Sequence, residues 1–263
     1  MTLGLDELLK NADYIILLLF RVGGLVVTSP IFGRVNIPRT AKICFTVSLT
    51  YLFLTVFPQT EPIVYTSLLG FLLICAGELV LGMALSYVTN IFFALTAFTA
   101  GQLIDMQIGF GIVNVYDIQN NMQAPVMGNV LNMLLLIVFF AIDGHHKLIE
   151  MVYLTIRALP IGTPVISPRL GLVALDVFKR AFLLGVMMAL PLLASGLTLE
   201  IAFGLMMRAV PQIHMFVVGI PLKMFVGMLV FAATLPIYTN FTSRVFEEMY
   251  NGIERIFAVF TGG

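Results

Sequence analysis

Three ionisable residues, Glu78, Glu200 and Lys223, lie inside long apolar runs and are the first candidates for chemistry in this sequence. A charge at the centre of a bilayer costs about 2.5–3.5 kcal/mol on insertion scales, so it normally has a partner or a function. One interpretation is a coupling-ion or proton site of a transporter, with Pro191 and Pro221 breaking the helices around it. The other is buried pairing, in which these side chains are polar anchors between helices or between subunits.

Asp143, His145 and His146, with Glu150 four residues after the second histidine, are the candidates for a metal site. No further ligand has a compelling position, and neither an HExxH motif nor paired CxxC motifs occur. A structural turn at a helix boundary is therefore the favoured interpretation of this cluster.

Nucleophilic and nucleotide chemistry lack their motifs as well. No GxSxG is present, and Ser195 has no histidine nearby in the sequence. Tyr116-Asp117 lacks the second GxGD element of intramembrane aspartyl proteases, and no P-loop occurs. The sequence predicts no catalytic residue, no metal and no cofactor, and hence a protein that is not an enzyme.

The amino-acid composition indicates the class of protein that carries these residues. Of the 263 residues, 60% are hydrophobic and 11% are charged, and the net charge is zero. Soluble proteins are roughly 45–50% apolar and about 25% charged, so a soluble globular enzyme is excluded. A neutral chain also lacks the basic surface that nucleic-acid binding requires. The expected class is an all-α protein of the integral membrane type.

Six apolar runs are expected to form membrane-type helices, but their lengths disagree with the placement of the charges. If the run 63–100 is one span, the basic loop 143–180 falls outside, against the positive-inside rule. A hairpin near Thr89-Asn90 restores the rule, but its second limb, 91–100, is too short to cross a bilayer. We therefore expect helices that are short, broken or packed against other apolar proteins. The runs are 14–31, 43–57, 63–100, 126–142, 181–203 and 215–237.

Small residues are candidates for close helix packing. Gly70, Gly77 and Ala84 recur every seven residues, so they share one face of the long helix expected over 63–100. Close backbone approach at small residues holds membrane helices together. This spacing predicts a helix-packing seam, although glycine is also simply common in membrane helices.

The segment 101–125 mixes glycine and polar residues with bulky apolar ones. Irregular backbone between apolar helices must be shielded by protein or line a wet cavity. The segment is interpreted either as a gating or plugging loop of a conduit or as an ordinary extracytoplasmic loop. Its candidate site residues are Gly101, Asp105, Met106, Ile108, Gly109, Phe110, Gly111, Ile112, Asn114 and Met122.

Several motifs, in this order and spacing, resemble the FliR family of flagellar export proteins, whose injectisome homologues are the SctT proteins. One departure is His214, where the family pattern leads us to expect asparagine. The motifs are Arg21-x-Gly-Gly, Pro30-Ile-Phe-Gly, Val35-Asn-Ile-Pro38, Gly77-Glu78-x-x-x-Gly82, Ala100-Gly101-Gln-x-Ile-Asp105-x-Gln-x-Gly109-Phe110, Asp143-Gly144-His145 and the stretch from Gly204 to Lys223.

The resemblance implies a pore-forming subunit of the flagellar type III export gate. It implies one export-gate domain, 1–263, with a FliP-like part, 1–180, and a FliQ-like helical hairpin and C-terminal helix, 181–263. It implies assembly with FliP and FliQ, with FlhB and FlhA nearby, in the bacterial inner membrane at the flagellar basal body.

The implied cargo is unfolded flagellar subunits, and the segment 101–114 with the residues just beyond it maps to a loop that plugs the channel. Glu78, Glu200 and Lys223 would then be polar anchors. The alternative from the residues alone is a small-solute secondary transporter that uses Glu78 and Glu200.

Overall fold

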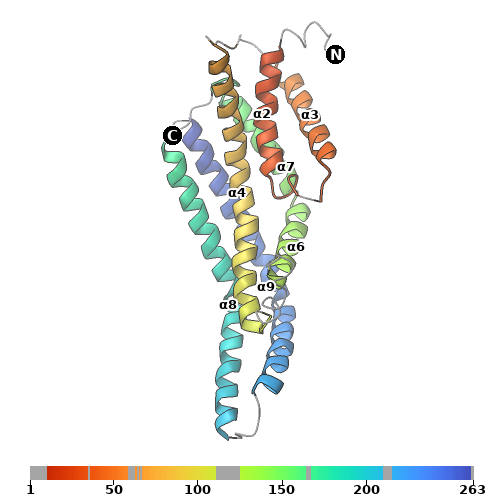
Figure 1. Ribbon diagram of the computed structural model, residues 1–263, viewed down its shortest axis with the longest axis vertical. Helices are drawn as coiled ribbons and strands as arrows, with labels where there is room; N and C mark the ends of the chain where they lie inside the picture. The colour runs from red at the N-terminus through yellow and green to blue at the C-terminus, as the bar shows by residue number, and fades with distance from the viewer. Residues whose placement is uncertain are drawn as a thin grey trace. The chain divides into compact units, whose positions relative to one another are not determined.

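The computed structural model describes residues 11–34, 36–58, 63, 65, 67–110, 125–163, 167–209 and 215–261. These residues form seven α-helices and no strand (Figure 1). The predicted all-α class is therefore confirmed. The helices are α2 (Ala12–Thr28), α3 (Arg39–Val56), α4 (Leu68–Ile108), α6 (Val126–Ala141), α7 (Gly144–Ala158), α8 (Arg169–Ala209) and α9 (Met215–Thr261).

Three of these helices are long and apolar enough to cross a membrane: α4, α8 and the part of α9 from Val218 onward. The number rises to four if α6 and α7 together make one broken span. Between α6 and α7, Asp143 adopts a left-handed backbone with a φ of 56°. Broken helices were expected in general terms, and this bent pair is one, although the sequence predicted a loop after residue 142.

The long apolar run is one continuous helix, so the hairpin considered near Thr89-Asn90 does not form. The helix also continues through Gly101 to Ile108, eight residues beyond the apolar run. Pro191 in α8 and Pro221 in α9 lie inside continuous helices, so they do not break them. Membrane-type helices tolerate internal proline because neighbouring groups satisfy the freed carbonyls.

The chain divides into two compact units that are discontinuous in sequence. The first contains 1–90, 143–177 and 249–263, and the second contains 91–142 and 178–248. The division at residue 180 into FliP-like and FliQ-like parts concerns relationships to other proteins, and it stays a prediction.

The first unit is organised around α2, which lies beside α3 (Figure 1). Leu17, Leu18, Val22 and Val26 on α2 are completely buried. Their spacing of one, four and four residues is that of a single helix face. That same face carries the charged residue Arg21, which must therefore find its partners inside the unit.

The second unit has an aromatic core. The ring centroids of Phe93 on α4, Phe139 on α6 and Phe246 on α9 lie 5.4–5.7 Å from one another. Tilted and edge-on contacts at such distances are favourable beyond the area they bury. This cluster joins the C-terminal half of α4 to α6 and α9.

Candidate functional site

Glu78 forms a fully buried ion pair with Arg21 in the first unit. The Nε of Arg21 lies 2.5 Å from one carboxylate oxygen of Glu78, and its Nη2 lies 3.1 Å from the other. The two side chains are 1% and 0% exposed. This two-point geometry between guanidinium and carboxylate is the strong form of an ion pair. It connects α2 with α4 across a separation of 57 residues.

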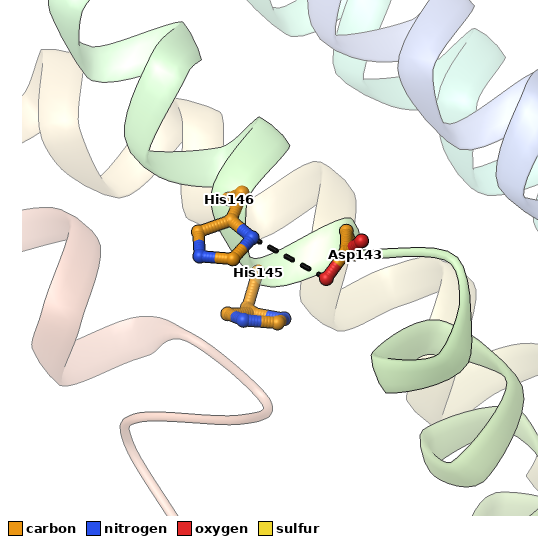
Figure 2. A group of neighbouring side chains, drawn as sticks. All are labelled: Asp143, His145 and His146. Atoms are coloured by element: carbon orange, nitrogen blue, oxygen red, sulfur yellow. Dashed lines mark ion pairs between the residues drawn. The ribbon is translucent and has the colours of Figure 1, made fainter.

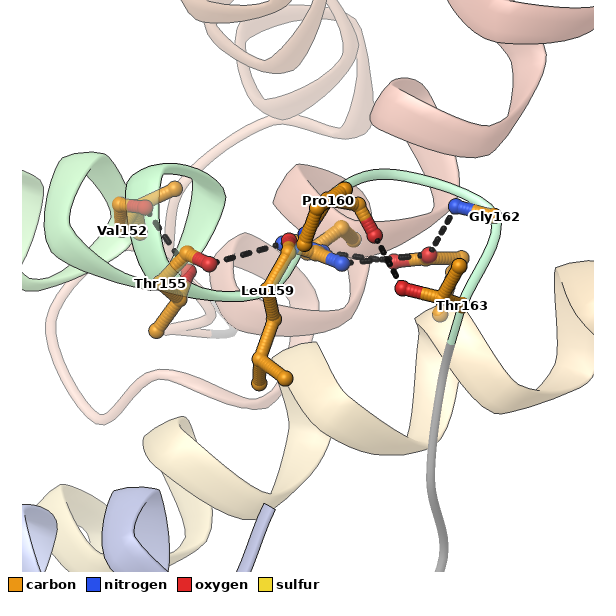
Figure 3. Close-up of polar contacts among 8 residues, drawn as sticks. Val152, Thr155, Leu159, Pro160, Gly162 and Thr163 are labelled. Carbon is orange, nitrogen blue, oxygen red and sulfur yellow. Dashed lines mark hydrogen bonds and ion pairs between the residues drawn. The ribbon is translucent and has the colours of Figure 1, made fainter. Parts of the chain in front are cut away.

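The remaining groups of this pair are also satisfied. Nη1 of Arg21 donates to the carbonyl oxygens of Thr155, at 3.2 Å, and Leu159, at 2.9 Å. The Gly162 amide donates to Glu78 over 2.8 Å. Figure 3 shows Thr155, Leu159 and Gly162 gathered around these contacts. The cation thus meets the carbonyls at the C-terminal end of α7, where the helix dipole favours positive charge.

The arrangement fits a structural anchor better than an ion path. Glu78 accepts three hydrogen bonds, so both carboxylate oxygens are occupied. A site that takes up and releases protons or ions needs a position that a water or an ion can reach. The structure identifies Arg21 as the partner of Glu78, and the role of Glu78 as a polar anchor stays a prediction. Arg21 belongs to the Arg21-x-Gly-Gly motif, but the sequence alone did not indicate that it pairs with Glu78.

The backbones of α2 and α4 approach most closely beside this pair, at Gly24 and Gly82. A Cβ atom at Gly82 would lie 2.1 Å from the carbonyl oxygen of Arg21, and one at Gly24 would lie 2.6 Å from that of Leu79. Both clashes are with backbone, which cannot move aside cheaply. This close contact of small residues in α4 involves a glycine that the predicted seam did not include.

The predicted seam of Gly70, Gly77 and Ala84 is not this crossing. A Cβ at Gly70 would meet only the Ser67 hydroxyl, at 3.5 Å, which is an ordinary contact. Gly77 is buried, whereas Ala84 lies partly exposed on an apolar groove. A role for these three residues in packing against another protein stays a prediction.

The other two candidate anchors meet each other in the second unit. The Lys223 ammonium on α9 pairs with the Glu200 carboxylate on α8, and the Gln107 amide on α4 donates to the same carboxylate over 3.4 Å. The side chain of Lys223 is 17% exposed and that of Glu200 is 41% exposed. The cluster therefore joins three helices next to the end of α4, but it is much more open than the pair at Glu78.

The first part of the predicted gating segment is the end of α4, so the expectation of irregular backbone is wrong for 101–108. Gly101 lies against Gly128 of α6 so closely that a Cβ atom would come within 2.2 Å of its backbone. Asp105, fully buried, accepts a hydrogen bond of 3.2 Å from the Met127 amide. A carboxylate at the first turn of α6 also favours that helix end electrostatically.

The segment leaves the helix at Gly109, whose φ of 99° is accessible mainly to glycine. Directly before this turn, Ile108 is 2% exposed and packs against Gly227 of α9, whereas Met106 is 64% exposed. Phe110, in the turn, is half-buried. Gly111, Ile112, Asn114 and Met122 lie outside the described residues.

Asp143, His145 and His146 gather at the break between α6 and α7 (Figure 2). Nδ1 of His146 lies 3.4 Å from Asp143, and the side chains of these two residues are 70% and 73% exposed. The His146 amide also donates to the Asp143 carbonyl over 3.0 Å. These contacts are what a turn that begins a helix requires, and the absence of a metal here stays a prediction.

The long apolar helices and the buried polar contacts between them define the class of this protein. It is a helical membrane-type protein in which the ionisable residues of the apolar runs join one helix to another. A family model described as bacterial export proteins, family 1, matches residues 13–249. The chain belongs to this family.

Individual relatives agree with the family match and extend it over most of the chain. A protein of Escherichia coli strain K12 is 31% identical, over 89% of this chain and 88% of the relative. Proteins of Aquifex aeolicus and Bacillus subtilis are 26% and 24% identical, over 95% and 93% of this chain and 96% and 94% of their own lengths. All three are called flagellar biosynthetic protein FliR, so the resemblance to the FliR family is confirmed.

Proposed function

We propose that this chain is a non-enzymatic subunit of the flagellar protein export gate in the bacterial inner membrane. In this role it assembles with FliP and FliQ around a pore through which unfolded flagellar subunits pass, next to FlhB and FlhA. Family membership over 13–249 supports a part in bacterial export. The observation that carries the gate assignment is the end of α4, a firmly held helix that stops in a glycine turn at the start of the predicted plug.

A gate must hold its plug in place yet let it move. The base of the segment meets the first requirement, because Gly101, Asp105 and Ile108 fix α4 to α6 and α9 inside the second unit. Gly109 meets the second requirement. Because glycine has no side chain, it can end the helix at a positive φ without steric strain. In this proposal Ile108 anchors the segment, and Met106 and Phe110 belong to the seal together with Ile112 and Met122.

Apolar residues suit a seal for a closed export pore. Methionine is flexible and polarizable, so it fills irregular gaps and repacks when a chain passes. A dewetted apolar constriction also blocks ions without needing a charge. This chain supplies no nucleotide motif, so the proposal assigns the energy for export to other components.

The direct test of the assignment is native mass spectrometry of the tagged chain, purified in detergent after expression alone or beside FliP and FliQ. We expect a defined heteromer with one copy of this chain when the partners are present. A monomer or homodimer that ignores both partners would refute the gate assignment.

The plug is tested separately, by deleting residues 109–114 in the assembled complex. We expect normal assembly and a membrane that leaks ions or small molecules. The matched control replaces Phe110 alone with leucine, which keeps the apolar bulk and should keep the barrier. An intact barrier in the deletion would remove the plug from the proposal and would leave the role in assembly in place.

The alternative, a secondary transporter that uses Glu78 and Glu200, receives less support from the geometry. Both carboxylate oxygens of Glu78 are engaged by Arg21 and Gly162. Glu200 is paired with Lys223, which neutralises it. Proton-coupled uptake by the purified chain, lost on replacing Glu78 with glutamine, would favour the transporter over the gate.

A further inference from the structure

A cavity of about 220 Å³ lies between α8 and α9 in the second unit, and its lining includes no residue of the Glu200–Lys223 cluster. Four residues of α8 line it with the spacing of one helix face, and Arg244 and Glu248 of α9 complete it. A water molecule occupies about 30 Å³ in the liquid, so the cavity has room for a group of several heavy atoms. The residues of α8 are Arg180, Leu183, Leu184 and Met187.

The cavity has a cationic end and an apolar end. Arg180 and Arg244 face it with the single carboxylate of Glu248, so its lining carries a net charge of +1. The flanking residues Lys179 and Glu247 offset each other. Beyond the charges, Leu184 is 7% exposed, whereas Leu183 is 53% exposed and Met187 is 40% exposed. A cationic pocket that opens onto exposed apolar side chains fits an amphiphilic anion.

The arginines are well placed to take an anion. The Nη1 of Arg180 is 3.5 Å from the Glu248 carboxylate, and both side chains remain at least one-third exposed. Arg244 is exposed, and within the part of the chain that the structure describes no acidic side chain pairs with it. An incoming phosphodiester can therefore bind Arg244 directly, with the guanidinium of Arg180 on the same cavity.

The position along the helices indicates what the anion is attached to. Arg180 directly precedes the apolar run 181–203 of α8, and on α9 the apolar run ends at Ile237, before the polar stretch that leads to Arg244. Both helices qualify as membrane spans. The two arginines thus lie where the hydrocarbon region ends, which is the depth of phospholipid headgroups. Basic pockets between membrane helices at this depth bind anionic headgroups.

We propose that this cavity is a binding site for an anionic phospholipid. Its phosphodiester contacts Arg180 and Arg244, and its acyl chain lies along Leu183 and Met187. The proposal concerns a different part of the second unit from the end of α4, and it does not depend on the gate assignment.

The test is a native mass spectrometry titration of the full chain in detergent, with phosphatidylglycerol or phosphatidylcholine of the same acyl chains. We expect phosphatidylglycerol to be retained preferentially. A basic residue near an anionic surface contributes about 1 kcal/mol, so Arg244→Gln should weaken retention of phosphatidylglycerol about fivefold. Arg208→Gln removes the same charge from the far end of α8 and should leave it unchanged.

A second variant predicts a change of opposite sign. Glu248→Gln removes the only carboxylate of the cavity and should strengthen retention of phosphatidylglycerol about fivefold. A merely structural Arg180–Glu248 pair would give no such gain. Equal losses for Arg244→Gln and Arg208→Gln, or equal retention of the two lipids, would overturn the lipid site. The pocket would then fit an acidic segment of a partner protein instead.

Two measurements separate a lipid from a free anion. Glycerol phosphate has the charge without the acyl chains and should not displace phosphatidylglycerol at the same concentration. The chain contains no tryptophan, so Met187→Trp introduces a single tryptophan, which can be excited selectively over tyrosine, on the apolar wall. Phosphatidylglycerol with brominated acyl chains should quench it. Full displacement by glycerol phosphate, or an absence of quenching, would refute the lipid.

Discussion

Replacing Glu78 with glutamine removes the counter-charge of a completely buried arginine. Arg21 is 1% exposed, so its guanidinium cannot turn to water. Removing one partner of a buried ion pair costs about 3–5 kcal/mol, because the other charge stays desolvated. The glutamine can still accept from the Gly162 amide, so the predicted loss is that of the ion pair itself.

The assay is thermal unfolding of the purified chain in detergent. The readout is the fraction of the protein that remains monodisperse at each temperature. For a chain of this size each kcal/mol corresponds to roughly 2–4 °C, so we expect Tm to fall by about 6–20 °C. The matched control is Glu200→Gln, because that pair is partly exposed and contributes at most about 1 kcal/mol. The same substitution in two apolar helices thus tests burial alone.

The double replacement of Arg21 and Glu78 with methionine provides a further check. An apolar pair in place of a buried ion pair is often neutral, but here the Leu159 carbonyl loses its donor and the Gly162 amide loses its acceptor, whereas the Thr155 carbonyl keeps the Leu159 amide. An unsatisfied buried group costs about 1–3 kcal/mol, so the double variant should still melt below the unsubstituted chain. If Glu78→Gln melted at the same temperature as Glu200→Gln, the anchor argument would be wrong.

Three more predictions concern glycine positions and one carboxylate. Gly82→Ala places a methyl group 2.1 Å from backbone and should lower Tm by several degrees, whereas Gly70→Ala has space and should not, as a thermal melt of both would show. Gly109→Val requires a left-handed backbone, so in the assembled complex it should change ion leak through the gate. Gly204→Val is the control: no atom lies near the added group, so the ion leak should not change. Asp105→Ala removes the acceptor of a buried amide and should cost about 1–3 kcal/mol in the same melt; an unchanged Tm would show that water replaces the carboxylate.

The apolar runs predicted the helices well where a helix is apolar all round. The run 126–142 corresponds to α6 within one residue. Where a helix is amphipathic, apolarity was a poor guide: the loop expected over 143–180 contains α7 and the start of α8. In α7 only one stripe, which includes Leu148 and Val152, is buried. The exposed charges of the helix lower its average hydropathy, so a search for membrane spans does not find it. These charges are Lys147, Glu150 and Arg157.

The candidate site was predictable in residue type and not in pairing. Charges in apolar runs are costly, so Glu78 and Lys223 could be selected from the sequence alone. That Glu78 pairs with Arg21 depends on a contact across 57 residues, and it requires α2 and α4 to cross at Gly24 and Gly82. A single sequence gives no information on such a crossing. The one available signal was an arginine in an apolar run followed by two glycines.

The difference between the two ion pairs bears on how such a protein joins an assembly. A pair that is sealed within one chain, as at Glu78, can only stabilise that chain, because no partner can reach it. Glu200 is 41% exposed, so its carboxylate retains capacity for a donor from outside while Lys223 and Gln107 hold it in position. A partly exposed ionisable side chain in an apolar helix has a high free-energy cost when it faces lipid. The cost is lower when the side chain faces another protein that can pair with it. The open pair therefore favours a surface that another subunit covers, and the gate assignment requires such a surface.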